Sequence, residues 1–437
     1  MTTIFDPGFE PGFRSRLESG LDPVVGPAAV SPVSVPVRRQ AALQRLQATR
    51  PERRRGFALG RRRGRDREDP TVVLGPPPVA YYVIAVVVAV FVMLGLVMVL
   101  SASAATEVGK GNSPYRIFTR QLMWAGCGLA GLLVAIKVPY RRWRPFVIPI
   151  AILATAGMAL PFTSRFGATI NGARAWVMFG SLSVQPSELL KLATLALAAD
   201  LLATRHEQMA NPRRTLFPLM LIAAVGATAC LAQGDLGTAV VLGAIVLAVG
   251  FIAGVPMAYM TGVVATGMFT IAVFVLSSTR RFNRFTAFFD TRGNKDYLAY
   301  QTYQGYLGIA NGGLTGSGIG GSNSKLGYLP LAHSDFIFAV IADELGFVGA
   351  LAVVGGFALL VWFGIQTALA APDRFGMLLA GGIATWFGVQ AIVNMGGVTG
   401  LLPVTGLTLP FFSVGGTSLF VTMVAAGLLL NVARRAR

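Results

Sequence analysis

VAYYVIAVVVAVFVMLGLVMVL, residues 79–100, is an apolar run without a single charged side chain. A helix needs about 20 such residues to cross the hydrocarbon core of a bilayer. Similar runs recur to the end of the chain, so the sequence predicts an all-α polytopic membrane protein. The ten predicted transmembrane helices are 80–101, 121–138, 145–162, 186–204, 215–232, 237–254, 258–277, 336–364, 376–397 and 412–432.

The composition agrees with a membrane protein. Of the 437 residues, 54% are hydrophobic and 13% are charged, whereas a soluble chain carries about a quarter charged residues. Both cysteines lie in apolar runs, so we expect no disulfide framework. The two histidines, His206 and His333, are too few for a histidine-rich metal site.

Residues 1–78 are predicted to form a disordered, Arg- and Pro-rich cytoplasmic tail before a membrane domain at 79–437. The first 70 residues hold 14 Arg against eight acids, and no apolar run near Met1 indicates a cleaved signal peptide. The Arg cluster at 50–69 is interpreted as a solvated segment that orients the first span. Binding of anionic lipid, nucleic acid or a partner is the alternative, although we expect no nucleic-acid function.

Short basic segments predict the orientation of the helices. Cytoplasmic loops are enriched in Lys and Arg, and alternation from a cytoplasmic N-terminus places four short basic segments on that side, whereas the Arg-containing loop 278–335 is the exception. These segments are 140–144, 204–214, 371–375 and 433–437. Both termini are therefore expected in the cytoplasm, and the large loop 278–335, between the seventh and eighth spans, is expected on the outer face.

This large loop is longer than a simple connector needs to be. Its first part alternates three arginines in 280–284 with phenylalanines, a pattern typical of a short amphipathic helix lying in the membrane interface. A Gly-rich segment, 311–324, follows, and the loop ends in KLGYLPLAHSDF (325–336), where basic, aromatic and acidic residues come together. We therefore interpret the loop as functional.

Polar residues mark several outer ends of the predicted helices. Glu188 and Lys191 are spaced i,i+3 on one helix, which suits an ion pair, and Arg174 precedes them in an outer loop. Asp235 falls in the next outer turn, where capping a helix is the simpler role. The Pro- and Gly-containing segment 400–418 predicts irregular backbone, which survives at membrane depth only inside protein or beside a polar cavity. Together these segments predict one outward-facing polar cavity that opens sideways to lipid.

Four segments resemble, in their order along the chain, the signature segments of the SEDS family (shape, elongation, division, sporulation). They are NGARAW…QPSELLKLA (171–193), QGDLGTA (233–239), KLGYLPLAHSDFIFAVIADELGF (325–347) and GLLPVTGLTLPFFSVGGTS (400–418). The resemblance covers residues 80–435 and is greatest for the cell-division members. It implies a ten-span glycosyltransferase that polymerises lipid II into peptidoglycan at the division septum.

The resemblance assigns the family's essential carboxylate to Asp335. It implies a base that takes a proton from the 4-hydroxyl of an acceptor GlcNAc, in an inverting displacement of undecaprenyl pyrophosphate. A helix N-cap and a ligand for Mg²⁺ or Mn²⁺ are the alternatives for this residue, and no organic cofactor is implied. The candidate substrate-binding residues are Lys325, His333, Arg174, Glu188, Lys191, Asp235 and Ser413.

The sequence also departs from the family pattern. Leu331 and Gly327 stand where some members carry acids, which concentrates the assignment on Asp335. Val414 replaces a tyrosine. The leaving pyrophosphate needs cations, and the candidates are Lys325, Arg174, Lys191, Arg280, Arg281 and Arg284.

Partners and alternative functions follow from the same resemblance. It implies lipid II and the nascent glycan strand as ligands, and an FtsI-like class B penicillin-binding transpeptidase and other division proteins as partners at the septal plasma membrane. A lipid II flippase and a non-catalytic scaffold of the division machinery are the alternatives. A flippase predicts polar residues continuing to the cytoplasmic side, and the apolar inner halves of spans four to six disfavour it.

Overall fold

The structure is a computed structural model, and it describes the chain from residue 76 to residue 436 with short gaps. The described ranges are 76–170, 172–180, 182–209, 211–297, 299–322, 329–330 and 332–436, with the backbone alone at residues 280 and 284. The predicted tail lies almost entirely outside these ranges. Its disorder, its Arg cluster and the domain boundary after residue 78 therefore stay predictions.

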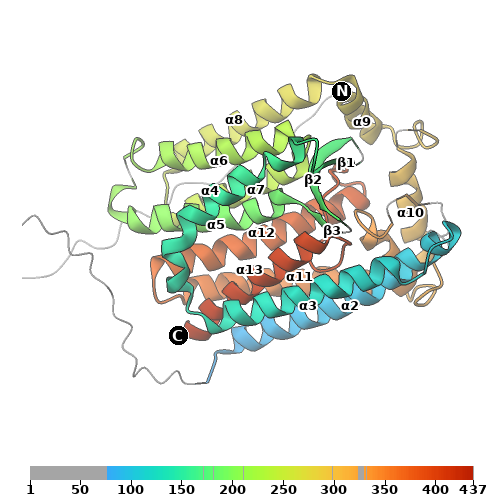
Figure 1. The fold of residues 1–437 in the computed structure, drawn as a ribbon, viewed down its shortest axis with the longest axis horizontal. Coiled ribbons are helices and arrows are strands. Elements are labelled where there is room, and N and C mark those ends of the chain that lie inside the picture. The colour runs from blue at the N-terminus through green and yellow to red at the C-terminus, as the bar shows by residue number, and fades with distance from the viewer. Residues whose placement is uncertain are drawn as a thin grey trace, which may run out of the picture. The chain divides into compact units, whose positions relative to one another are not determined.

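Helices make up most of the described chain (Figure 1). The α-helices are α2 (Val79–Gly109), α3 (Arg116–Lys137), α4 (Val147–Gly157), α5 (Pro186–Thr204), α6 (Leu216–Ala232), α7 (Leu236–Ala253), α8 (Met257–Leu276), α9 (Thr279–Phe289), α10 (Tyr300–Gly312), α11 (Ile337–Leu369), α12 (Arg374–Val398) and α13 (Gly416–Arg435). Three short 3-10 segments are η1 (Tyr140–Phe146), η2 (Leu160–Phe162) and η3 (His206–Gln208).

Every predicted span overlaps one of these helices, and the third overlaps η1, α4 and η2 together, although several ends differ: α2 continues to Gly109 and α11 to Leu369. By length and composition, eight helices of the described chain are apolar enough to cross a membrane. The apolar helix α6 is shorter, with 17 residues, and α5 carries Glu188, Lys191 and Asp200. The predicted polytopic, mostly helical fold is confirmed, whereas the count of ten membrane-crossing helices stays a prediction.

Helix boundaries follow local signals. Pro186 stands at the first position of α5, where its missing N–H costs nothing. The Asp235 Oδ1 atom accepts the Thr238 N–H at 2.9 Å and caps α7. In the same way, Asp373 Oδ1 accepts the Gly376 N–H at 2.8 Å and caps α12.

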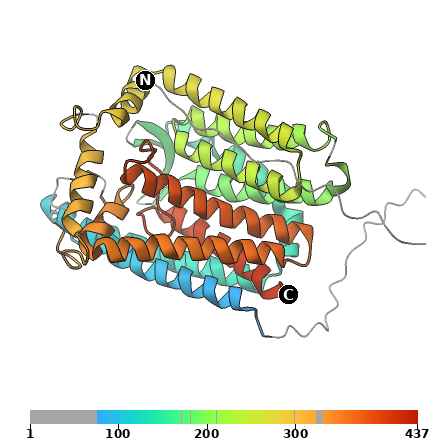
Figure 2. The ribbon, with the colours of Figure 1, turned by 180° about the vertical axis from the view of Figure 1, so that it is seen from behind.

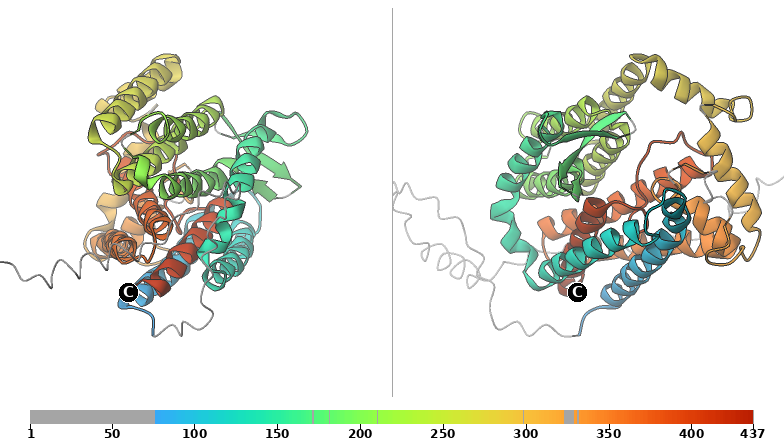
Figure 3. Two further views of the ribbon diagram at one scale, coloured as in Figure 1. Left: turned by 90° about the vertical axis from the view of Figure 1, so that its left-hand side faces the viewer. Right: turned by 45° about the vertical axis from the view of Figure 1, so that its right-hand side comes forward.

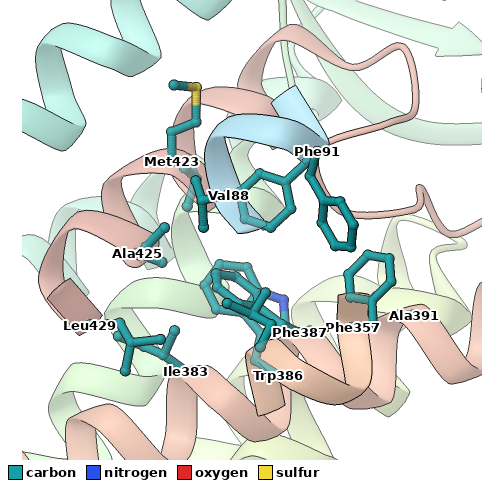
Figure 4. Packing of buried hydrophobic residues seen from close by; sticks show 14 of the residues in the cluster. Val88, Phe91, Phe357, Ile383, Trp386, Phe387, Ala391, Met423, Ala425 and Leu429 are labelled. Carbon is teal, nitrogen blue, oxygen red and sulfur yellow. The ribbon is translucent and has the colours of Figure 1, made fainter. Parts of the chain in front are cut away.

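Close helix packing depends on small residues, as is usual where the surroundings are as apolar as the side chains. Helix α13 lies against α3 at Gly427, where an added Cβ would come within 2.6 Å of the Leu132 carbonyl oxygen. Aromatic side chains fill the centre, with the rings of Phe91 and Phe357 4.7 Å apart and those of Phe387 and Phe411 5.4 Å apart. Figure 4 shows this cluster, with Phe91 from α2, Phe357 from α11 and Phe387 from α12 meeting between the helices.

A small antiparallel sheet, which the sequence analysis did not anticipate, connects η2 to α5. Its strands β1 (Gly167–Ile170), β2 (Ala173–Phe179) and β3 (Leu182–Val184) lie in that order. Ala168 pairs with Trp176, and Met178 pairs with Ser183. The sheet, α9, α10 and the turn between α2 and α3 gather at the same end of the bundle (Figures 1 and 2). We call it the sheet end.

The opposite end of the bundle carries the C-terminus of α13 (Figures 1 and 3). Here the Tyr140 hydroxyl donates to Asp373 Oδ2 at 2.5 Å, and Arg141 Nε lies 2.7 Å from the same oxygen. The Arg435 guanidinium lies 6.0 Å from the Tyr140 ring centroid. Three of the basic segments predicted to share one membrane side therefore lie together, and which side that is stays a prediction.

The large loop 278–335 begins with a helix, as predicted, since α9 follows α8 after a sharp turn. The Arg281 guanidinium lies 3.8 Å from the Phe274 ring centroid of α8. The Gly-rich segment is attached to α11, because Ser322 Oγ donates to Asp343 Oδ2 at 2.5 Å and the Ser317 N–H donates to the Asp343 carbonyl at 2.9 Å.

Candidate functional site

A cavity of about 680 Å³ lies at the sheet end. Its walls come from the three-stranded sheet, α3, α5, α7, α9, the start of α10 and two irregular segments, 333–335 and 404–408. All four segments that resemble the SEDS signatures contribute residues to it. Both polar and apolar side chains line the walls, so the cavity suits an amphiphilic ligand better than a purely apolar one.

Asp335 lies in the wall of this cavity, two residues before α11. Its carboxylate faces Gly406, where an added Cβ would stand 3.7 Å from Oδ2, and Gly406 has a φ of +75° that favours glycine. The N-cap of α11 is Phe336, and no side chain caps the helix. The helix-capping alternative for Asp335 is therefore wrong.

Hydrogen bonds to three consecutive carbonyls hold the Asp335 segment in place. The His333 carbonyl accepts the Val414 N–H at 2.9 Å, and the Ser334 carbonyl accepts Ser413 Oγ at 2.6 Å. The Asp335 carbonyl accepts Asn394 Nδ2 at 2.9 Å. With its main chain attached to both α12 and the segment before α13, Asp335 has little freedom to move.

Asn394 also connects the two irregular walls of the cavity. The same Nδ2 group donates to the Leu407 carbonyl at 2.7 Å. The residue is 5% exposed, so losing these bonds would leave buried carbonyls without a donor. The sequence analysis missed Asn394, because an amide inside the apolar run 376–397 gives no signal of its partners.

The environment of Asp335 favours the protonated carboxyl. Burial raises the pKa of Asp335 from 3.8 to about 7, although a hydrogen bond from the Ser334 side chain lowers it; the nearby Asp235 charge adds to the rise. Burial, together with Lys110 and Arg120, lowers the pKa of His333, and Glu107 opposes this change. The site therefore combines a carboxyl that titrates near neutrality with an imidazole that stays neutral there.

Glu188 and Lys191 form the ion pair that their spacing predicted, with Lys191 Nζ 2.9 Å from Glu188 Oε2. Glu188 lines the cavity, whereas Lys191 is fully buried behind it. Lys191 Nζ also donates to Gln390 Oε1 at 2.9 Å and lies 5.2 Å from the Trp386 ring centroid. The charge of Lys191 is thus satisfied within the protein.

Asp235 both caps α7 and lines the cavity. Its second oxygen, Oδ2, accepts Gln185 Nε2 at 3.2 Å. Gln185 and Thr238 line the cavity as well. Asp235 can therefore cap α7 and still face a ligand in the cavity, which are the two roles considered from the sequence.

The other predicted site residues lie elsewhere. Among the described residues, Arg174 is exposed on β2 and Ser413 is buried against the Asp335 segment, and neither lines the cavity. Lys325 lies outside the described residues. Within the described ranges, no three His, Cys, Asp or Glu side chains come together as a metal site requires, and the expected Mg²⁺ or Mn²⁺ stays a prediction.

Comparisons with known proteins match nearly the whole membrane domain. A family model described as "Cell cycle protein" (FtsW/RodA/SpoVE) matches residues 81–437. The probable peptidoglycan glycosyltransferase FtsW of Geobacter metallireducens is 37% identical over 341 residues, which cover 78% of this chain and 91% of the relative. The stage V sporulation protein E of Bacillus subtilis is 35% identical over 354 residues, which cover 81% and 97%.

Two solved structures resemble the fold. One belongs to a study of the structural coordination of polymerization and crosslinking by a peptidoglycan synthase complex, with a TM-score of 0.67 and 30% identity. The other is the rod shape determining protein RodA of Thermus thermophilus, with a TM-score of 0.60 and 31% identity. Each match covers 81% of this chain and 97% of the solved chain.

Proposed function

The chain belongs to the FtsW/RodA/SpoVE family, the SEDS proteins, and from this premise we propose that it is a peptidoglycan glycosyltransferase that polymerises lipid II during septal wall synthesis. One observation carries the proposal: the carboxyl of Asp335 faces a cavity built from all four SEDS-like segments. Hydrogen bonds hold its main chain in place, and burial raises its pKa to about 7. Enzymes arrange such perturbed carboxyls where a proton must move.

Asp335 acts as the base in this proposal. The acceptor 4-hydroxyl is a weak nucleophile, and a carboxylate within hydrogen-bond distance takes its proton as the glycosidic bond forms. An α-linked donor gives a β-linked product by a single inverting displacement, which needs one base and no covalent intermediate. Undecaprenyl pyrophosphate leaves from the opposite face of the sugar.

The cavity end faces the outside of the cell in this proposal, since the basic segments of the opposite end favour the cytoplasm. A class B penicillin-binding transpeptidase crosslinks the strands that emerge there. The resemblance to a chain from a peptidoglycan synthase complex supports such a partner. Mg²⁺ typically binds substrate phosphates with only one or two protein carboxylates, and ligation of such an ion by Asp335 is the alternative to its role as the base.

Polymerisation should rise with pH through about 7, because the pKa of Asp335 is raised to about 7 and only the carboxylate is a base. The native state keeps this proton between pH 3.8 and about 7, where the unfolded state releases it. Stability from this group therefore falls over the same window in which activity rises. Initial polymerisation rates and the free energy of unfolding, each measured between about pH 5 and 9, test the expected rise in rate and fall in stability. A pH-independent rate would contradict the assignment.

Asn394→Leu should reduce polymerisation by about 10- to 100-fold, because the Asp335 and Leu407 carbonyls lose their donor and the base shifts. Rates and thermal unfolding of the purified variant are the measurements. Asn283→Leu, at an exposed position of α9, is the matched control. An Asn394 variant that polymerises at the wild-type rate would show that this amide does not position Asp335.

The decisive experiment is reconstitution of the full chain in liposomes with lipid II, with and without its cognate transpeptidase. Formation of glycan strands supports the polymerase. Transfer of labelled lipid II between leaflets without strand formation would favour the flippase instead. If neither occurs under any partner or metal condition, the scaffold function remains.

A further inference from the structure

Helix α11 is broken at Gly346, whose φ of +67° and ψ of −167° lie outside the helical region. This combination of angles is open essentially to glycine alone. The break separates a first half of the helix, 337–345, from a second half, 347–369. The first half begins two residues after Asp335, so whatever places this half also places the carboxyl of the proposed base.

Residues 313–318 of the Gly-rich segment lie in this break, and we call them the inserted segment. In an unbroken α-helix, each carbonyl accepts the N–H group four residues later. The Asp343 carbonyl instead accepts the Ser317 N–H at 2.9 Å, and the carbonyl of Glu344 accepts the Gly318 N–H at 3.0 Å. Two carbonyls of the first half are therefore satisfied by the inserted segment rather than by the helix.

The N–H groups that would be the helical partners of these two carbonyls are satisfied in the same way. The Phe347 N–H donates to the Gly313 carbonyl at 2.9 Å. The Val348 N–H donates to the Leu314 carbonyl at 3.2 Å. The inserted segment thus replaces two complete helical hydrogen bonds, and on its withdrawal the same four groups are free to pair with one another and close the helix.

Glycines allow the inserted segment to approach α11 this closely. A Cβ added to Gly346 would lie 2.4 Å from the Gly316 nitrogen, and one added to Gly316 would lie 2.2 Å from the Glu344 carbonyl oxygen. One added to Gly312, at the end of α10, would lie 1.9 Å from the Ala342 carbonyl oxygen. A side chain at any of these glycines would therefore push the inserted segment out of the break.

Helix α10 extends the same contact back to the neighbour of Asp335. A Cβ added to Gly305 of α10 would lie 2.9 Å from the ring of Phe336. The start of α10 lines the cavity with Gln301 and Thr302. Helix α10 and the inserted segment therefore pack along the first half of α11 from the cavity to the break.

The second half of α11 is fixed to α2. The rings of Phe91 and Phe357 lie 4.7 Å apart, and a Cβ added to Gly356 would lie 2.5 Å from the Phe91 ring. Closing the break turns one half of α11 against the other, and the second half cannot turn without losing this contact. The first half, with Asp335 before it, is therefore the part that moves.

We propose that the inserted segment positions Asp335. While it lies in the break, it holds the first half of α11 at the angle that places the Asp335 carboxyl in the cavity wall. When it withdraws, the two helical hydrogen bonds form, α11 becomes continuous and the carboxyl leaves its place. The loss of polymerisation that follows rests on the proposed function, whereas the exchange of hydrogen bonds does not.

Gly346→Ala tests this assignment, because alanine is strained at these angles and its Cβ displaces Gly316. With the full chain in liposomes, kcat should fall by about 10- to 100-fold, since a small misplacement of a catalytic group has an effect of this size. The KM for lipid II should stay close to that of the wild type. Gly316→Ala should have the same effect from the other side of the contact.

Hydrogen exchange of the same proteins follows the hydrogen bonds directly. In Gly346→Ala, the Ser317 and Gly318 amides should exchange at least about 10-fold faster than in the wild type, because they lose their acceptors. The Phe347 and Val348 amides should stay protected, because the closed helix supplies new acceptors. General unfolding would expose all four amides, so the pattern separates closing of the break from loss of structure.

The Val414 amide reports on the segment that carries Asp335. It donates to the His333 carbonyl at 2.9 Å, and this bond weakens when the first half of α11 moves. In Gly346→Ala the Val414 amide should therefore exchange faster than in the wild type, whether or not lipid II is present.

Two other glycines provide matched controls. Gly254→Ala places an alanine at a φ of +86° at the end of α7, and Gly355→Ala adds a methyl group to the second half of α11. At both positions an added Cβ meets no atom of the described residues within 4 Å. Both variants should keep the kcat of the wild type and its exchange rates in the inserted segment.

Several results would overturn the assignment. One is wild-type exchange at Ser317 and Gly318 in both Gly346→Ala and Gly316→Ala. Another is a fall in kcat in Gly254→Ala as large as that in Gly346→Ala. Loss of protection at 347–348 together with the inserted segment would show that the break unfolds instead of closing, which also contradicts the assignment.

Exchange and polymerisation give separate answers. If the wild type makes no strands, the proposed function fails, and exchange at Val414 still decides whether the inserted segment holds the Asp335 segment. If the wild type makes strands and Gly346→Ala keeps both its kcat and its exchange rates, the positioning role fails and the polymerase stands.

Discussion

Replacing Asp335 with asparagine should reduce lipid II polymerisation by about 10²–10⁴-fold, the usual contribution of a general base. The amide keeps the size of the side chain, and the backbone bonds from Val414, Ser413 and Asn394 do not depend on the carboxylate. The variant should therefore fold and still bind donor lipid. Strand formation from lipid II, resolved by gel, is the measurement.

Asp296→Asn is the matched control, because Asp296 is an exposed aspartate of the same large loop. It should polymerise at the wild-type rate. Asp335→Asn should also unfold at or above the wild-type temperature at neutral pH, since a buried carboxylate no longer needs to ionise. Near wild-type strand formation by a folded Asp335→Asn protein would remove the base mechanism altogether.

Replacing Lys191 with methionine should destabilise the protein by about 3–5 kcal/mol, the usual cost of leaving one partner of a buried ion pair uncompensated. Glu188 and Lys191 are 2% and 0% exposed, so water compensates little of the lost contact. Gln390 also loses the Lys191 donor, although Trp386 Nε1 still donates to its Oε1 at 2.7 Å. Unfolding in mixed detergent measures the change.

The double variant Glu188→Gln with Lys191→Met should recover much of this stability, because no buried charge is then left alone. Lys137→Met is the control, since Lys137 is exposed at the end of α3, and its unfolding should change little. Equal stability of Lys191→Met and the wild type would show that the Glu188–Lys191 ion pair does not stabilise the fold. That result would favour a direct role of Lys191 with substrate.

The spans were predictable because each is a local property of the chain. A run of apolar residues must leave water whatever surrounds it, and its length limits it to a helix. The fourth predicted span, 186–204, has the same bounds as α5. The sheet at 167–184 was missed because its short strands carry no clean alternation, and its register comes from pairing between strands.

Part of the cavity was predictable, and part was not. Glu188, Asp235, His333 and Asp335 line it, as expected from polar residues at the ends of spans. Arg120 was missed because an arginine near the start of a helix looks like an ordinary membrane flank. Its place in the cavity wall depends on contacts of α3 with residues about three hundred positions away.

The sequence by itself determined a helical membrane protein, the places of its apolar helices along the chain and, through its SEDS-like segments, the carboxylate on which the proposed chemistry depends. Only the tertiary structure decided that Asp335 is not a helix cap, that Asn394 holds its carbonyl from 59 residues away, and that Arg120 shares its cavity. The physical reason is the range of the forces. Transfer of a side chain out of water is settled residue by residue, whereas hydrogen bonds and charges act between groups that only folding brings together.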